Sequence, residues 1–108
     1  MSHEQLSFDK YQEEARKTAI YKDRKNSWYT YPLLGLGGEV GELQQIFKKA
    51  IRYEGGVLSE EAVQRIKDEA GDVLWYLTEL ITSMGGTLNE VARLNLEKLR
   101  SRHGEKGA

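Results

Sequence analysis

The sequence predicts an all-α protein, a four-helix bundle formed by a single domain that covers residues 1–108. Apolar residues recur at the 3.6-residue period of a helix in four successive segments. A single proline and a few glycine clusters leave short connections between these segments. A chain of 108 residues is long enough for one core of modest size.

The first predicted helix covers residues 7–23, where Phe8, Tyr11, Ala15 and Ala19 follow the helical period. Its start signal is Ser7 or Asp9. A polar and aromatic loop follows and ends at Pro32. Its aromatic residues either cap the core or form a wall for a flat ligand such as a nucleobase; they are Trp28, Tyr29 and Tyr31.

The second predicted helix covers residues 33–53 and contains four glycines, at positions 35, 37, 38 and 41. Each glycine costs a helix roughly 1 kcal/mol relative to alanine. We therefore expect another helix or a ligand to approach the backbone closely at these positions. The sequence EGG at Glu54–Gly56 predicts the end of this helix, because glycine is favoured there.

The third predicted helix covers residues 59–84, with Ser59 as its N-cap, and stops at Gly85 and Gly86. The fourth covers residues 88–103. It begins after a capping box in which Thr87 is followed three residues later by Glu90.

Composition excludes several classes of function. Charged residues make up 31% of the chain but the net charge is −1, so no general field attracts nucleic acid or an anionic membrane. The absence of cysteine excludes disulfides, thiolate chemistry and cysteine-ligated zinc. No apolar segment reaches membrane-spanning length and the N-terminus lacks an apolar signal region, so we expect a cytoplasmic protein.

Two carboxylate pairs lie inside apolar runs of the second and third helices: Glu39 with Glu42, and Glu69 with Asp72. Each pair is spaced i, i+3, which places both members on one face of a helix. If the two helices pack antiparallel, all four carboxylates converge, and a cation must then offset their repulsion. Oxygen donors favour Mg²⁺, with Mn²⁺ as a substitute. The only histidines, His3 and His103, lie at the termini, which argues against iron or zinc.

Several further residues are candidates for contacting a substrate. On the fourth helix, Asn95, Lys98 and Arg102 border the apolar stripe and form a set suited to phosphate oxygens. Lys49 follows the first carboxylate pair, where it is either a counter-charge or a surface residue. Tyr76 lies one turn after Asp72 and contacts a ligand or packs, whereas Trp75 is expected to point outward, towards a subunit interface.

The segments GLGGEVGEL, KDEAGDVLWYL and NLEKLRSR resemble the MazG family of all-α nucleoside triphosphate pyrophosphohydrolases. The resemblance implies hydrolysis of a (deoxy)nucleoside triphosphate to the monophosphate and pyrophosphate, in nucleotide-pool sanitation or adjustment. It implies that Glu39, Glu42, Glu69 and Asp72 hold Mg²⁺. It also implies that the basic set on the fourth helix contacts phosphates or sugar, and that a homodimer or a dimer of dimers completes the cleft.

In this hypothesis Glu39 or Glu42 accepts a proton from the attacking water, and spacing does not distinguish them. Two alternatives stay open. One is phosphoribosyl-ATP pyrophosphohydrolase, which breaks the same type of bond, and the other is a non-catalytic helical module with a structural metal site. The base specificity also stays open. The candidates for reading the edge of the base are Gln12, Asn26 and Gln45.

Overall fold

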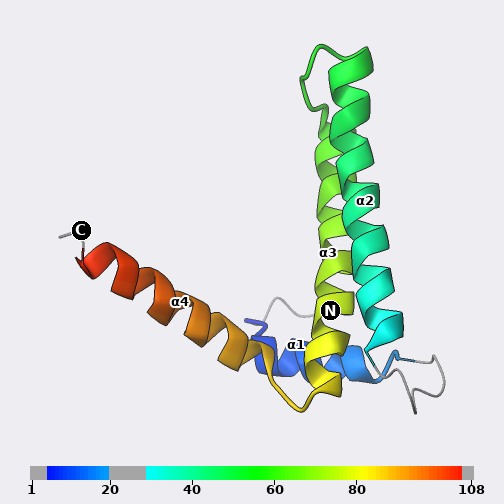
Figure 1. Ribbon diagram of the computed structural model, residues 1–108. Coiled ribbons are helices and arrows are strands. Elements are labelled where there is room, and N and C mark those ends of the chain that lie inside the picture. Colours follow the sequence, from blue (N-terminus) through cyan, green and yellow to red (C-terminus); the bar gives the residue numbers. More distant parts are fainter. Residues whose placement is uncertain (1–4, 20–28, 106–108) are drawn as a thin grey trace.

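The structure is a computed structural model that describes residues 5–19 and 29–105. It contains α1 (Phe8–Arg16), α2 (Thr30–Tyr53), α3 (Glu60–Ser83) and α4 (Leu88–Glu105), and no strand in these residues. Helices α2 and α3 form a long antiparallel hairpin, and α1 crosses the end of α3 farthest from the hairpin turn (Figure 1). Trp28 and Asn26, both predicted to contact substrate, lie outside the described residues.

The predicted start signals are confirmed at three helices. The side-chain oxygens of Ser7, Ser59 and Thr87 each accept a hydrogen bond, at 3.1 Å, from the backbone N–H three residues later. The predicted stops are confirmed as well. Gly55 and Gly56 follow α2 with φ of 62° and 81°, and Gly85 follows α3 with φ of 83°; few other residues adopt such angles.

Two helix boundaries differ from the prediction. Helix α1 ends at Arg16 rather than near residue 23, because Thr18 and Ala19 bond to the carbonyls three residues earlier and tighten the last turn. Helix α2 begins at Thr30, before Pro32, because the first turn of a helix does not need the N–H that proline lacks.

Helix α1 is attached to α3 by polar contacts that the sequence did not reveal. The Arg16 guanidinium donates to Glu79 Oε1 at 2.8 Å, and the Glu79 side chain is fully buried. Gln12 donates to Thr82 Oγ1 at 2.8 Å and accepts from the backbone N–H of Leu88 at 2.9 Å. Gln12 therefore has a structural role in joining α1 to the start of α4, in place of its predicted contact with a base.

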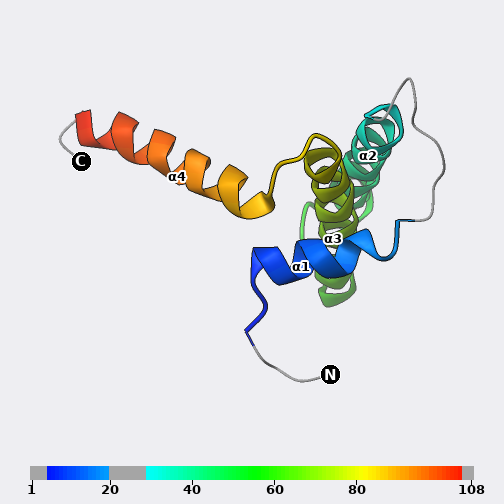
Figure 2. The ribbon, with the colours of Figure 1, turned by 90° about the horizontal axis from the view of Figure 1, so that it is seen from below.

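The described residues form four helices and no strand, which confirms the predicted all-α class, but within the single chain these helices do not close into a bundle. Helix α4 packs against α1 and projects away from the α2–α3 hairpin (Figures 1 and 2). The buried apolar core of the described residues is correspondingly small. It consists of Ala15, Ile46, Ala50 and Leu88. Helical periodicity predicts an apolar face on each helix, but it does not state what covers that face.

Large apolar side chains are exposed on both α2 and α4. On α2 they include Leu33, Val40 and Phe47, seven residues apart, and Ile51 one turn further on. On α4 they are Val91, Leu94, Leu96 and Leu99. None of the helices in the described part of the chain is long and apolar enough to span a membrane.

Candidate active site

Three of the four predicted carboxylates converge in the α2–α3 hairpin. Glu39 comes from α2, and Glu69 and Asp72 come from consecutive turns of α3. One carboxylate oxygen from each of the three lies within 4.8 Å of the others. The antiparallel hairpin brings together three of the four carboxylates that were expected to converge, and we call these three residues the carboxylate cluster.

The cluster is electrostatically strained in the absence of a cation. A hydrogen bond to Glu69, loss of water and the negative charges of Asp72 and Glu69 raise the pKa of Glu39 to about 7. Glu69 Oε2 is buried and has no hydrogen-bond partner among the described residues. A buried carboxylate oxygen without a donor is costly, so both features fit a group of oxygens arranged around a positive charge.

The donor set fits a hard divalent cation. The three residues offer only carboxylate oxygens, the ligands that Mg²⁺ and Mn²⁺ prefer, and no histidine joins them in the described part of the chain. Such an ion, when bound, neutralises phosphate charge and makes phosphorus more electrophilic.

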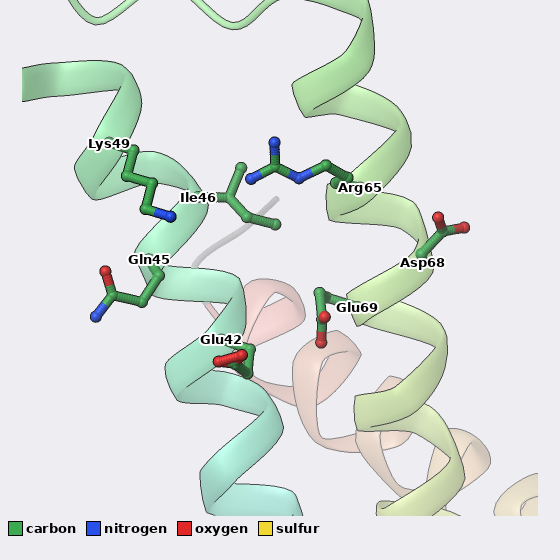
Figure 3. Close-up of a pocket in the computed structure, with 7 residues that line it drawn as sticks. All are labelled: Glu42, Gln45, Ile46, Lys49, Arg65, Asp68 and Glu69. Atoms are coloured by element: carbon green, nitrogen blue, oxygen red, sulfur yellow. The ribbon is translucent and has the colours of Figure 1, made fainter. Parts of the chain in front are cut away.

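The fourth predicted carboxylate, Glu42, lies beside the cluster rather than in it. It is exposed, and it lines a cavity of about 540 Å³ between α2 and α3 together with Glu69 (Figure 3). The other polar side chains around this cavity are Gln45, Lys49, Arg65 and Asp68. Lys49 was predicted to contact substrate and Gln45 was a candidate for reading the base, whereas no pattern in the sequence indicated Arg65 or Asp68.

A second cavity, of about 440 Å³, lies farther from the hairpin turn than the first, because its lining residues on the two helices precede Glu42 in α2 and follow Glu69 in α3. Glu39 and Asp72 line it together with Thr18, Trp75 and Tyr76. The indole Nε1 of Trp75 donates to Thr18 Oγ1 at 2.8 Å, and the ring meets Tyr76 edge-on with centroids 5.0 Å apart. Trp75 was expected to point outward, and it is half-buried: Thr18, just after α1, holds its indole beside the carboxylates.

Tyr76 lies at the cluster, as expected from its position after Asp72. Its ring centroid is 6.2 Å from that of Tyr31 in the first turn of α2. Loss of water and a hydrogen bond with Tyr31 raise the pKa of Tyr76. The predicted substrate residue Tyr31 thus approaches the second cavity through Tyr76.

The predicted phosphate-binding set lies elsewhere in the single chain. Asn95 and Lys98 line a separate cavity of about 330 Å³ on α4, and Arg102 is exposed further along that helix. Because α4 projects away from the hairpin, these residues and the carboxylate cluster lie on different parts of the molecule (Figure 1).

The fold and the cluster together define a class: all-helical proteins in which carboxylates from a helical hairpin form a candidate divalent-metal site. The chain belongs to the MazG family, since residues 31–106 match the model of the MazG nucleotide pyrophosphohydrolase domain. It therefore carries a nucleotide pyrophosphohydrolase domain, and the acidic hairpin is the part of it able to hold a divalent metal.

The chain is also similar to the Gene 37 protein of Mycobacterium phage L5. The two are 37% identical over 101 residues, which cover 90% of this chain and 89% of the phage protein. The name of that relative describes no activity. No solved structure matches the chain.

Proposed function

We propose that this protein hydrolyses (deoxy)nucleoside triphosphates to the monophosphate and pyrophosphate, with Mg²⁺ or Mn²⁺ as cofactor. The observation that carries the proposal is the convergence of Glu39, Glu69 and Asp72 within 4.8 Å in a chain of the MazG family. These three carboxylates would hold the metal, and Glu42, which lines the adjoining cavity with Glu69, would assist them. A role in adjusting or cleaning the nucleotide pool in the cytoplasm would follow.

The reaction needs water to attack the α-phosphorus while the bond from the α-phosphorus to the bridging oxygen breaks. The proton that water loses goes to a carboxylate, and the bridging oxygen leaves with pyrophosphate. Glu39, a member of the carboxylate cluster, is one candidate for this base. Glu42, in the exposed position beside Glu69, is the alternative.

The aromatic cavity is suited to the nucleoside. Trp75 and Tyr76 present apolar ring surface beside Glu39 and Asp72, and stacking on such rings accepts any base. Tyr31 would extend this surface through its contact with Tyr76. Trp28, outside the described residues, keeps its predicted role as a further stacking residue.

We further propose that the enzyme is a homo-oligomer, a dimer or a dimer of dimers. Leu33, Val40, Phe47 and Ile51 lie along one face of α2, and we call them the α2 stripe. Their spacing is suited to packing against another helix, and exposed apolar surface of this extent favours association. Helix α4, with an exposed apolar face of its own, suits the same association.

A second copy of the chain would also bring the basic residues of α4 close to a carboxylate cluster. Asn95, Lys98 and Arg102 lie away from the carboxylates of their own chain (Figure 1). If α4 packs on the hairpin of a partner, these side chains can reach the phosphates bound there. The resulting attraction between the basic helix and the acidic hairpin favours a copy of this chain over an unrelated partner.

The test is pyrophosphate release from the four NTPs, the four dNTPs, dUTP and phosphoribosyl-ATP, with Mg²⁺, with Mn²⁺ and with chelator. We expect metal-dependent release from a subset of the triphosphates. Glu39→Gln and Asp72→Asn should abolish turnover, whereas Glu61→Gln, an exposed carboxylate in the first turn of α3, should not.

Each other outcome has a defined meaning. Release from phosphoribosyl-ATP alone would establish the alternative substrate. No release from any substrate, with the metal still binding to the cluster, would overturn the enzymatic proposal in favour of a non-catalytic helical module.

A further inference from the structure

Two cavities of different chemical character adjoin the carboxylate cluster. Farther from the hairpin turn, Trp75, Tyr76 and Thr18 line the aromatic cavity of about 440 Å³. Nearer the turn lies the polar cavity of about 540 Å³, which contains Lys49 and Arg65 (Figure 3). Glu69 lines the polar cavity and Asp72 the aromatic one, although they are one turn apart on α3.

The two cations both lie between the carboxylates and the hairpin turn. Arg65 comes one turn before Glu69 on α3, and Lys49 comes two turns after Glu42 on α2. Since the helices run antiparallel, both steps lead towards the hairpin turn. Figure 3 shows the Arg65 and Lys49 side chains extending from opposite helices into the space between them, above Glu42 and Glu69.

Neither cation is neutralised by an ion pair with the described residues. The ion pairs found there involve Lys10, Arg16, Lys17 and Arg93. Asp68, which also lines the cavity, accepts a hydrogen bond from Gln64 at 3.1 Å. Glu42 and Glu69 lie below the two cations in the same cavity, so the end of the cavity that holds Arg65 and Lys49 is the part where their mutual repulsion favours an anion.

We propose that Arg65 and Lys49 bind the β- and γ-phosphates of the substrate and then the pyrophosphate product. This rests on the function proposed above. The bond to be broken joins the α- and β-phosphates, so the α-phosphate lies at the carboxylate cluster, with the nucleoside on one side and the leaving group on the other. The aromatic cavity takes the nucleoside, and the triphosphate points towards the hairpin turn.

Arg65 contributes most in this arrangement. Its planar guanidinium donates two parallel hydrogen bonds to phosphate oxygens, whereas Lys49 acts as a point charge. When the bond from the α-phosphorus to the bridging oxygen breaks, negative charge grows on the pyrophosphate. Both cations then stabilise the leaving group more strongly than they stabilise the bound substrate.

The experiment compares the two products as ligands. Inorganic pyrophosphate with Mg²⁺, and a deoxynucleoside monophosphate with Mg²⁺, are each titrated calorimetrically into the intact protein and its variants. We expect Arg65→Gln to weaken pyrophosphate binding by about tenfold or more, the loss typical of a charge-assisted hydrogen bond, with Lys49→Gln less affected. Binding of the monophosphate should change by less than about twofold, because it does not reach these residues.

The chain offers a matched control for each cation. Lys67→Gln removes an exposed cation from α3 and Lys48→Gln removes one from α2, and neither residue lines the polar cavity. Arg65→Lys, which keeps the charge but loses the paired donors, should restore part of the pyrophosphate affinity. Far-ultraviolet circular dichroism and the melting temperature establish that each variant is folded.

Two results would overturn the assignment. Unchanged pyrophosphate affinity in folded Arg65→Gln would exclude Arg65 from the phosphate site. An equal loss for pyrophosphate and monophosphate would show that the cations act only through their general field. The titration does not need turnover. If the wild type hydrolysed no substrate, the proposed function would be contradicted, and the binding of pyrophosphate to Arg65 and Lys49 could still be measured.

Discussion

Gly35 of α2 lies against the ring of Tyr76 of α3, so closely that a Cβ atom at position 35 would overlap the aromatic carbons. This contact accounts for one of the four glycines of α2 in the way the sequence predicted. At Gly37, Gly38 and Gly41 a Cβ would meet nothing within 4 Å in the described residues, so a close approach there is wrong for the single chain.

The first prediction concerns this contact. Gly35→Ala should destabilise the protein by about 1–3 kcal/mol, the usual cost of overpacking, because the Tyr76 ring must move. It should also lower turnover, since Tyr76 lines the cavity beside Asp72. Gly38→Ala is the matched control and should stabilise α2 by roughly 0.5–1 kcal/mol. Urea denaturation measures both, and equal effects at the two positions would contradict the role of Tyr76.

The second prediction concerns the attachment of α1 to α3. Arg16→Met should destabilise the protein by about 3–5 kcal/mol, because it removes the guanidinium that lies 2.8 Å from the fully buried Glu79 carboxylate. The double variant Arg16→Met with Glu79→Leu should recover much of this loss. Chemical denaturation of the two single variants and the double variant measures the coupling. Additive effects would show that the pair is not coupled.

The third prediction concerns pH. The pKa of Glu39 is raised from 4.5 to about 7 in the fold, so the folded protein holds a proton that the unfolded chain releases. This contribution to stability is fully present below pH 4.5 and is lost as the pH rises through 7. In chelator, the melting temperature should therefore fall between about pH 5 and pH 8.

Two comparisons test the cause of that fall. Glu39→Gln cannot ionise, and its melting temperature should depend less on pH over the same range. Mg²⁺ or Mn²⁺ should stabilise the wild type most at pH 8, where the carboxylates are ionised and free to bind the ion. A pH dependence that is identical in the wild type and in Glu39→Gln would assign it to another group.

The fourth prediction concerns the α2 stripe. Phe47→Glu places a charge in the middle of the stripe and should weaken self-association by at least about 30-fold, the effect of losing one interface hot spot. Tyr53→Glu, an exposed aromatic residue on the same helix but outside the stripe, should not. Sedimentation equilibrium measures the association. A monomeric wild type would refute the proposed oligomer directly.

The elements that local chemistry determines were predictable from the sequence. Ser59 and Thr87 begin their helices because their oxygens accept backbone N–H groups nearby in the chain, and the glycines at 55, 56 and 85 take angles that few other residues accept. The spacing of Glu69 and Asp72 likewise places both on one face of α3. Antiparallel pairing of α2 and α3 then brings Glu39 to them.

Contacts between distant segments were not predictable. Nothing in the sequence near Thr18 indicates that its hydroxyl accepts a hydrogen bond from the indole of Trp75. Nothing there indicates that α1 ends at Arg16 either. Arg65 was overlooked because an arginine on a helix is usually a solvated surface residue. Its significance appears only when the hairpin places it opposite Lys49. The direction of α4 also depends on packing and not on its own period.

The direction of α4 is sensitive to the position of Gln12. Its side-chain oxygen accepts from the first N–H of α4, while its nitrogen donates to Thr82 at the end of α3. Helix α4 has 18 residues and is therefore about 27 Å long, so a tilt of about 10° at Leu88 would displace its far end by about 5 Å. Because Gln12 and the packing of α4 on α1 together set this direction, small shifts of α1 would move the distant basic end of α4 without altering the carboxylates.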